Sequence, residues 1–198
     1  MMTTLVLTGS PENALLQAAG SEMAKFHGFP SASWALSDSV MLDSQASIEK
    51  LLTSFVHTLS NVSFVWGMGN FETSKTISPE AAVIDNEIAG NCIRFRNRFK
   101  VDEEHLAADL IRDLAFNGSF LESMHTLDHF REEIRYSGLL NRSNRGMWNR
   151  SGSLSIEEKA VEKVNEILNK KPEYYLSGIQ MDKLKDIEDK WNKRLNGK

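Results

Sequence analysis

The feature that most constrains the fold is an alternation of short apolar runs and amphipathic helical segments in the first half of the chain. The apolar runs are residues 5–9, 31–36 and 62–66, and a segment with helical periodicity follows each of them. Strands separated by helices of this length form right-handed crossovers, which predicts an α/β fold with a parallel sheet. Three strands cannot bury both faces of such a sheet and leave its edges open. Either the sheet has more strands than this count or the chain is part of something larger.

Local signals give the expected helix ends. Ser10, Asp43, Ser78, Asp102 and Ser155 are typical N-cap residues, and Gly28 is a suitable stop for the first helix. We therefore expect helices over residues 10–28, 43–59, 78–99, 102–114, about 123–135, 155–168 and from 182 onward. A stripe with helical spacing predicts the core-facing side of the third of these: Ile84, Ile88, Cys92, Phe95 and Phe99. Residues 141–155 are rich in Ser, Asn, Arg and Gly, which predicts a loop.

Charge and composition exclude several classes of protein. The 198 residues contain 23 Lys and Arg against 27 Asp and Glu, a net charge of −4, which argues against electrostatic binding of nucleic acid. No run of about 18 apolar residues predicts a membrane span. The opening residues lack the basic region of a signal peptide. The lone Cys92 fits a reducing compartment, so we expect a cytoplasmic protein.

Four separated blocks carry a family resemblance. The first two are Gly-Ser-Pro-Glu at residues 9–12 and Gly-Phe-Pro at 28–30 with Ala-Leu-Ser-Asp-Ser at 35–39. The others are Gly-Met-Gly-Asn-Phe-Glu at 67–72 with Ser-Pro-Glu at 78–80, and Phe-Leu at 120–121 with His125, His129 and Trp148. In order and spacing, they resemble the C-terminal portion of the trimethylamine methyltransferase family, which includes glycine betaine methyltransferases. The resemblance covers nearly the whole chain.

This resemblance implies a particular fold. Family members are large (β/α)8 barrels, so the chain is expected to be a partial TIM barrel. Residues 1–140 would form its last β/α units, and residues 141–198 a loop and helical extension of the same domain. Three strands cannot close a barrel. The first half would then be absent from this chain or supplied by another chain, and we expect a homo-oligomer or a complex with the missing half.

The resemblance also implies a reaction. The family moves a methyl group from a methylated amine to the Co(I) of a corrinoid protein, in methylamine metabolism and methanogenesis. Trimethylamine enzymes have pyrrolysine at the position where this chain has Ser37, and serine cannot form the corresponding amine adduct. Members without pyrrolysine are associated with quaternary amines such as glycine betaine, whose nitrogen leaves as a neutral amine without a general acid. The chain has no Asp-x-His-x-x-Gly corrinoid motif, so cobalamin is expected on a separate partner protein.

Residues near the ends of the candidate strands form the expected site. Ser37 and Glu72 are the candidate catalytic residues, and Trp34, Trp66, Phe71 and Asp38 are the candidates for binding the substrate cation. Purely structural roles remain open as alternatives: Trp66 could be an ordinary core aromatic, and Ser37 and Asp38 could simply form a turn.

A second group lies further along the chain. His125, His129, Ser119 and Ser123 are expected to line the entrance for corrinoid or substrate, with packing as the alternative role of the two histidines. The family commonly has histidines where this chain has the two serines. Although His125 and His129 have an i, i+4 spacing, no zinc motif is completed and no metal is expected. Arg94, Arg96 and Arg98 form either a solvated face or a docking surface for an acidic partner. The alternative to the enzyme is a truncated, non-catalytic half-barrel that completes another subunit.

Overall fold

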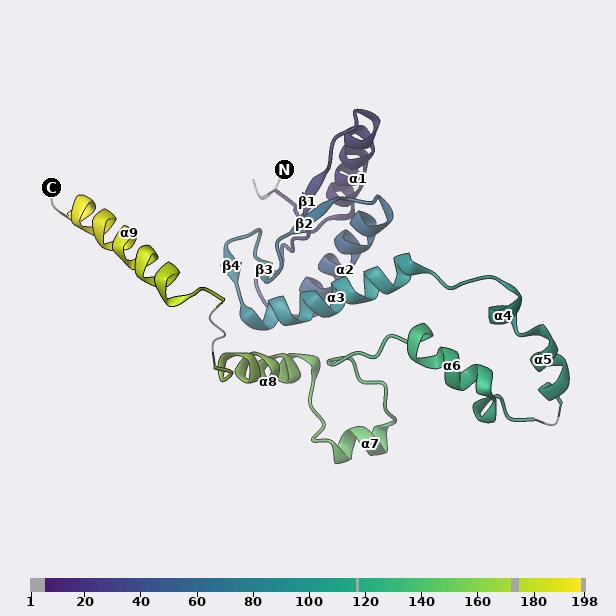
Figure 1. Cartoon of the computed structure of the whole chain (residues 1–198). Helices are drawn as coiled ribbons and strands as arrows, with labels where there is room; N and C mark the ends of the chain where they lie inside the picture. The colour runs from purple at the N-terminus through teal and green to yellow at the C-terminus, as the bar shows by residue number, and fades with distance from the viewer. Residues whose placement is uncertain (1–5, 117, 172–174, 197–198) are drawn as a thin grey trace. The chain divides into compact units, whose positions relative to one another are not determined.

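A computed structural model describes residues 6–116, 118–171 and 175–196, and it divides the chain into compact units of residues 1–164 and 165–198 (Figure 1). The elements of the first half are α1 (Pro11–Phe26), β1 (Ala32–Trp34), α2 (Ser44–Leu59), β2 (Phe64–Trp66), β3 (Asn70–Phe71), β4 (Thr76–Ile77) and α3 (Pro79–Asn97). They are followed by α4 (Glu103–Leu106), α5 (Ala108–Leu114), a 3-10 turn (Phe120–Glu122), α6 (Met124–Glu133), α7 (Arg145–Arg150) and α8 (Ile156–Leu168). The second unit contains the end of α8 and α9 (Gly178–Asn196).

The strands confirm the predicted crossover but not the predicted strand count. β1 and β2 pair in parallel, with Trp34 opposite Trp66, and α2 connects them. β3 and β4 form a short antiparallel hairpin that the sequence did not predict. The strand expected over residues 5–9 is wrong for residues 6–9, while residue 5 lies outside the described ranges. The described residues contain two two-stranded sheets and no closed barrel.

The helix caps agree closely with the sequence. Ser10, Asp43, Ser78 and Asp102 each accept a backbone N–H at their helix, as does Ser123 at α6. Ser155 and Glu158 form the expected reciprocal capping box. Gly28 follows the end of α1 with a φ of +74°, a conformation that favours glycine.

Three boundaries differ from the prediction. The expected helix over 102–114 is broken into α4 and α5 by Ala107, whose φ is 46°. The expected loop over 141–155 contains α7, because Asn144 caps a helical turn there. The last helix begins at Gly178 rather than at Asp182.

The faces that α1 and α2 bury differ from those that their apolar periodicity indicates. α2 buries Lys50, Thr53 and His57, while its apolar stripe, which includes Ile48 and Leu51, is exposed. α1 likewise buries small residues and exposes its large apolar ones: Leu15, Leu16, Met23 and Phe26. The inward faces combine buried alanines, Ala14 and Ala46, with buried polar side chains such as Ser21 and His57 that make hydrogen bonds.

The packing around α3 forms the apolar core of the first unit. Ile84 packs with Leu139 and Ala160, joining α3 to the segment after α6 and to α8. Ile84 and Cys92 are buried as predicted, but Phe95 and Phe99 at the end of the same stripe are exposed. Across the described ranges, no helix is both long and apolar enough to cross a membrane.

Candidate functional site

The loops that follow β1 and β2 meet at one edge of the parallel sheet. Parallel strands direct their carboxyl ends to the same edge, and the backbone joins the two loops there. The Glu72 N–H donates to the Ser39 carbonyl at 2.8 Å, and the Thr73 N–H donates to the Ser37 carbonyl at 2.9 Å. The structure therefore brings the segments of three predicted site residues, Ser37, Asp38 and Glu72, into direct contact.

Asp38 holds three pieces of chain together. Its carboxylate accepts from the Thr8 N–H at 2.8 Å, the Thr8 hydroxyl at 2.6 Å, the Gly9 N–H at 3.0 Å and the Thr73 hydroxyl at 3.2 Å. Partial burial opposes ionisation of this group, but hydrogen bonds from Thr8, Gly9 and Thr73 outweigh it and hold the pKa of Asp38 below its ordinary value. These contacts also explain why residues 6–9 form no strand, since Thr8 and Gly9 donate to a side chain.

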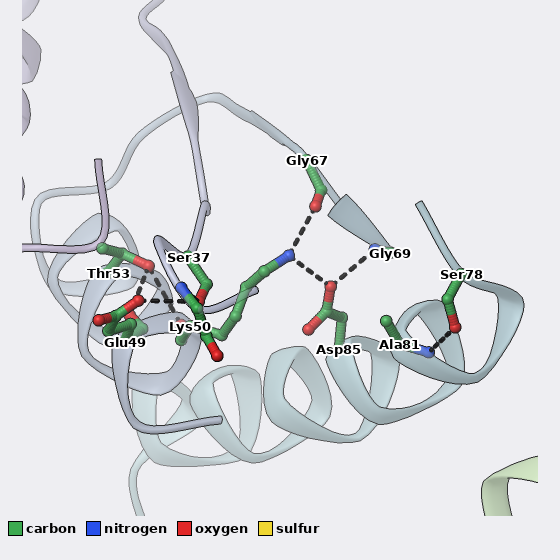
Figure 2. Close-up of polar contacts among 10 residues, drawn as sticks. Ser37, Glu49, Lys50, Thr53, Gly67, Gly69, Ser78, Ala81 and Asp85 are labelled. Carbon is green, nitrogen blue, oxygen red and sulfur yellow. Dashed lines mark hydrogen bonds and ion pairs between the residues drawn. The ribbon is translucent and has the colours of Figure 1, made fainter. Parts of the chain in front are cut away.

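Ser37 is fully buried, and its hydroxyl is directed at α2. The hydroxyl donates to Glu49 Oε2 at 2.8 Å (Figure 2) and accepts from the Ser39 N–H at 3.0 Å. The same Glu49 oxygen accepts from the Asp38 N–H at 2.7 Å. Glu49 is a residue that the sequence did not reveal. Gly9 packs against it, and a Cβ at Gly9 would overlap the Glu49 carboxylate.

Glu72 lies in a turn with an unusual backbone. Glu72, Thr73 and Ser74 have φ values of 52°, 53° and 70°, so three consecutive residues other than glycine adopt the left-handed region. The Glu72 carboxylate accepts from the Thr76 hydroxyl at 2.6 Å. Phe71, the preceding residue, is buried and pairs with Thr76 in the hairpin. Left-handed residues of this kind persist only where the surroundings hold them in place.

Trp34 and Trp66 form an aromatic surface on the open face of the parallel strands. They are cross-strand partners, their ring centroids are 5.3 Å apart, and they are 43% and 41% exposed. Phe64, two residues before Trp66, extends the surface with a centroid distance of 5.0 Å. Ser33 points to the opposite face and is buried against α2. In the described part of the chain, Trp66 is thus partly exposed and is not a buried core residue.

A buried ion pair lies next to these loops and was not predicted. Lys50 Nζ is 2.7 Å from Asp85 Oδ2 and 2.7 Å from the Gly67 carbonyl oxygen (Figure 2). Burial lowers the pKa of Lys50 and raises that of Asp85, and in each case the charge of the partner opposes the shift. The one sequence signal is a polar stripe on α2 opposite its apolar stripe, formed by Lys50, Thr53 and His57.

The predicted histidine group occupies the contact between α4 and α6. The His125 and His129 ring centroids are 4.5 Å apart, and the ring centroid of His105 lies 4.7 Å from that of His129. His125 Nε2 is 2.8 Å from the Glu104 carbonyl oxygen, and His129 Nε2 is 3.4 Å from Glu104 Oε1. The ring nitrogens named here thus have partners within the chain. No group of three or more His, Cys, Asp or Glu side chains suited to a metal occurs in the described ranges.

The two predicted serines differ in role. Ser123 caps α6, accepting from the Thr126 N–H at 3.2 Å and donating to the Phe120 carbonyl at 2.9 Å. Ser119 is exposed and makes no capping hydrogen bond with its side chain.

The arginine run is divided between two environments. Arg94 ties α3 to α6 by donating to the Glu133 carboxylate and carbonyl, each at 2.7 Å. Arg96 and Arg98 are exposed beside Phe99. The solvated-face interpretation therefore does not hold for Arg94, which is a structural residue.

Comparison with known proteins identifies the class. A family model described as trimethylamine methyltransferase matches residues 1–195, so the chain belongs to that methyltransferase family. It is 33% identical over 196 residues to the trimethylamine methyltransferase MttB of Methanosarcina barkeri (strain Fusaro), covering 96% of this chain and 38% of that protein. It is 32% identical over 162 residues to the glycine betaine methyltransferase of Desulfitobacterium hafniense (strain Y51), covering 81% and 34% of the two chains. The chain thus spans little more than a third of these relatives.

Proposed function

We propose that this chain is the C-terminal part of a methyltransferase, with the partial TIM-barrel architecture of its family, that takes a methyl group from a quaternary amine such as glycine betaine. The acceptor would be the Co(I) of a separate corrinoid protein. The observation that carries this proposal is the Trp34–Trp66 pair at the carboxyl edge of two parallel strands, with both rings open to the surface. Aromatic faces attract quaternary ammonium groups because the ring quadrupole is negative at its face.

The surrounding contacts divide the work among the candidate polar residues. Asp38 already accepts four hydrogen bonds, so it holds the loops together. Ser37 is committed to Glu49 and shapes the turn, consistent with a substrate that needs no covalent adduct. Glu72 is the carboxylate proposed to neutralise the cation, because its one described side-chain bond is from Thr76.

The corrinoid partner would supply a nucleophilic cobalt, and the chain's own residues would bind and orient the donor. A quaternary nitrogen leaves as a neutral amine, so no residue has to deliver a proton. Orientation then matters most, because the cobalt must approach the methyl carbon from the side opposite the departing nitrogen. We place His125, His129, Ser119 and Ser123 along the contact with the partner protein.

The test measures donor binding and methyl transfer separately. Calorimetry with glycine betaine is run on the wild-type chain and on Trp34→Leu and Trp66→Leu, with Trp191→Leu in α9 as a matched exposed control. Each site variant is expected to bind roughly tenfold more weakly, in the range of cation–π contributions. The absorbance change of reduced corrinoid protein then reports transfer from a panel of methylated amines. Transfer from trimethylamine alone would contradict the donor class, and equal binding by all variants would refute the aromatic site.

The non-catalytic alternative is supported by a separate observation. Large apolar side chains are exposed on α1 and α2, including Leu16 and Ile48, and the parallel sheet has only two strands in the described ranges. A half-barrel that completes another subunit would present such surfaces. Light scattering with a dye for exposed apolar surface distinguishes the cases. A monodisperse monomer that binds no dye would refute the completing module, and the absence of methyl transfer from every donor would favour it.

A further inference from the structure

We infer that Lys50 and Asp85 are positioning residues that fix the Gly67–Gly69 turn and, through it, the β3–β4 hairpin that carries Glu72. The link to substrate binding rests on the proposed function; the link to the hairpin does not. Neither residue faces the aromatic surface, since their side chains are 4% and 6% exposed between α2 and α3.

The pair holds the turn at both ends. Lys50 Nζ donates to the Gly67 carbonyl at 2.7 Å, and Asp85 Oδ2 accepts from the Gly69 N–H at 2.7 Å. Because the ion pair itself is 2.7 Å long, α2 and α3 are connected through the turn by one continuous polar chain, visible in Figure 2. The turn follows β2 directly, so its geometry sets where the chain goes after Trp66.

Close packing leaves the turn few alternatives. Gly67 and Gly69 have φ values of +93° and +82°. A Cβ on Gly67 would lie 2.9 Å from the Ala35 carbonyl oxygen, and one on Gly69 would lie 3.0 Å from the Ser78 carbonyl oxygen. Both glycines are therefore required by conformation and by space.

The hairpin beyond the turn is strained and held from two sides. Glu72, Thr73 and Ser74 are all left-handed, which is unfavourable for residues with a Cβ. On one side, the Ser39 and Ser37 carbonyls accept from Glu72 and Thr73. On the other side, the Gly69 carbonyl accepts from the Ser78 N–H at 3.0 Å, closing the base of the hairpin. Asp85 fixes that base by accepting from the Gly69 N–H, so replacing Asp85 weakens the hydrogen bonding on this side of the hairpin.

Stability alone does not account for the pair. Buried ion pairs contribute little net stability, because desolvation of both charges offsets their attraction, and an apolar pair of similar volume often serves as well. An apolar pair cannot donate to the Gly67 carbonyl or accept from the Gly69 N–H. What the charged pair supplies beyond packing is the direction of these two hydrogen bonds.

The decisive experiment separates hairpin order from global stability. Amide hydrogen exchange is measured residue by residue on the full chain and on Lys50→Met/Asp85→Leu, with urea unfolding run in parallel. We expect at least tenfold faster exchange at the Gly69, Glu72 and Thr73 amides, with α1 amides and the unfolding midpoint close to wild type. Unchanged protection at those three amides would overturn the inference.

Two further variants protect this result from misreading. Glu87→Gln removes another partly buried ion pair of α3, with Arg135, and is expected to leave exchange in the hairpin unchanged. Lys50→Met/Asp85→Asn also removes both charges but keeps an oxygen for the Gly69 N–H, so it is expected to retain most of the protection at that amide. Loss of protection at Gly69 in this variant, equal to that in Lys50→Met/Asp85→Leu or found in it alone if the Leu variant does not fold, would mean general packing damage and would overturn the inference.

The functional consequence has its own readout. Glycine betaine is titrated into wild type and the double variant, and roughly tenfold weaker binding with an unchanged unfolding midpoint is expected. Equal affinity would separate the hairpin from the cation site and overturn that link. If wild type itself binds no glycine betaine, the proposed function fails, while the exchange pattern still decides whether the pair positions the hairpin.

Discussion

Replacing Asp38 with asparagine tests how the loops at the carboxyl edge are held together. The asparagine side chain would keep one acceptor oxygen, for the Thr8 and Thr73 donors. Its amide group, however, would place a second donor against the Gly9 N–H, which now donates to Asp38 Oδ2 at 3.0 Å. The substitution also removes the negative charge from all four hydrogen bonds. We expect the Asp38→Asn chain to be less stable than wild type.

The size of the effect follows from these contacts. A hydrogen bond to a charged group contributes about 1.5–3 kcal/mol, against about 0.5–1.5 kcal/mol for a neutral one. The four bonds share one charge and the side chain is only half-buried, so the differences do not add in full. We expect a loss of about 2–3 kcal/mol at pH 7, a substantial part of the roughly 5–15 kcal/mol typical of a domain.

The pH dependence of this stability difference tests the contribution of the Asp38 charge independently. The pKa of Asp38 is lower in the folded chain than the ordinary value of 3.8, so the folded state holds the ionised form. Its contribution is fully present above pH 3.8 and is lost as the pH falls from there toward the folded pKa. The difference between wild type and Asp38→Asn should therefore shrink as the pH falls below about 4.

The assay is urea unfolding followed by tryptophan fluorescence and circular dichroism at pH 7 and pH 3. Asp109→Asn is the matched control, because Asp109 pairs with Arg112 on an exposed surface where the pair contributes about 1 kcal/mol or less. Equal unfolding midpoints for wild type and Asp38→Asn at pH 7 would refute the reasoning. So would a difference that stays constant down to pH 3.

Three further predictions concern single side chains. Burial lowers the pKa of His57, so the folded chain binds a proton there less tightly than the unfolded chain does. Stability should therefore fall as the pH drops below about 6.5. His57→Gln should reduce this dependence of the urea unfolding midpoint on pH. Gly67→Ala should destabilise the chain by about 2–3 kcal/mol, because Gly67 has a positive φ and a Cβ there would meet the Ala35 carbonyl. Gly20→Ala should instead stabilise the chain by about 0.5–1 kcal/mol, since Gly20 lies in α1 with open space around it. Equal shifts of the two variants in thermal unfolding would contradict this. Glu72→Gln should weaken glycine betaine binding by about 1–3 kcal/mol in calorimetry, and an unchanged affinity would remove Glu72 from the site.

Local chemistry was readable from the sequence because it acts over three or four residues. Ser10, Asp43 and Ser78 cap their helices as expected, since an N-cap needs only its own side chain and a nearby N–H. The parallel pairing of β1 and β2 was also predictable, because a helical crossover requires it. The β3–β4 hairpin was not, because its turn uses Glu72 and Thr73 where glycine or asparagine normally gives the signal.

Long-range contacts limited how much of the candidate site could be predicted from the sequence. Lys50 and Asp85 are 35 residues apart, and the polar stripe that contains Lys50 does not indicate which residue it pairs with. The stacking of His105 on His129 likewise depends on how α4 meets α6, which no spacing along the chain encodes. Periodicity located the apolar stripe of α2 correctly but could not say which face would be covered. A period identifies a helix, whereas burial depends on its neighbours.

The two faces of α2 carry different kinds of interaction. Its inward face makes directional contacts: Lys50 with Asp85 and the Gly67 carbonyl, and His57 with Ser33. Hydrogen bonds fix orientation and contribute about 0.5–3 kcal/mol each, whereas apolar burial adds about 25 cal/mol per Å² without fixing orientation. The exposed apolar stripe of α2 therefore adds little of this burial within the described residues. The polar face instead fixes the turn after β2 through the Gly67 carbonyl, so the geometry of the candidate site depends on the hydrogen-bonded face of α2 rather than on its apolar stripe.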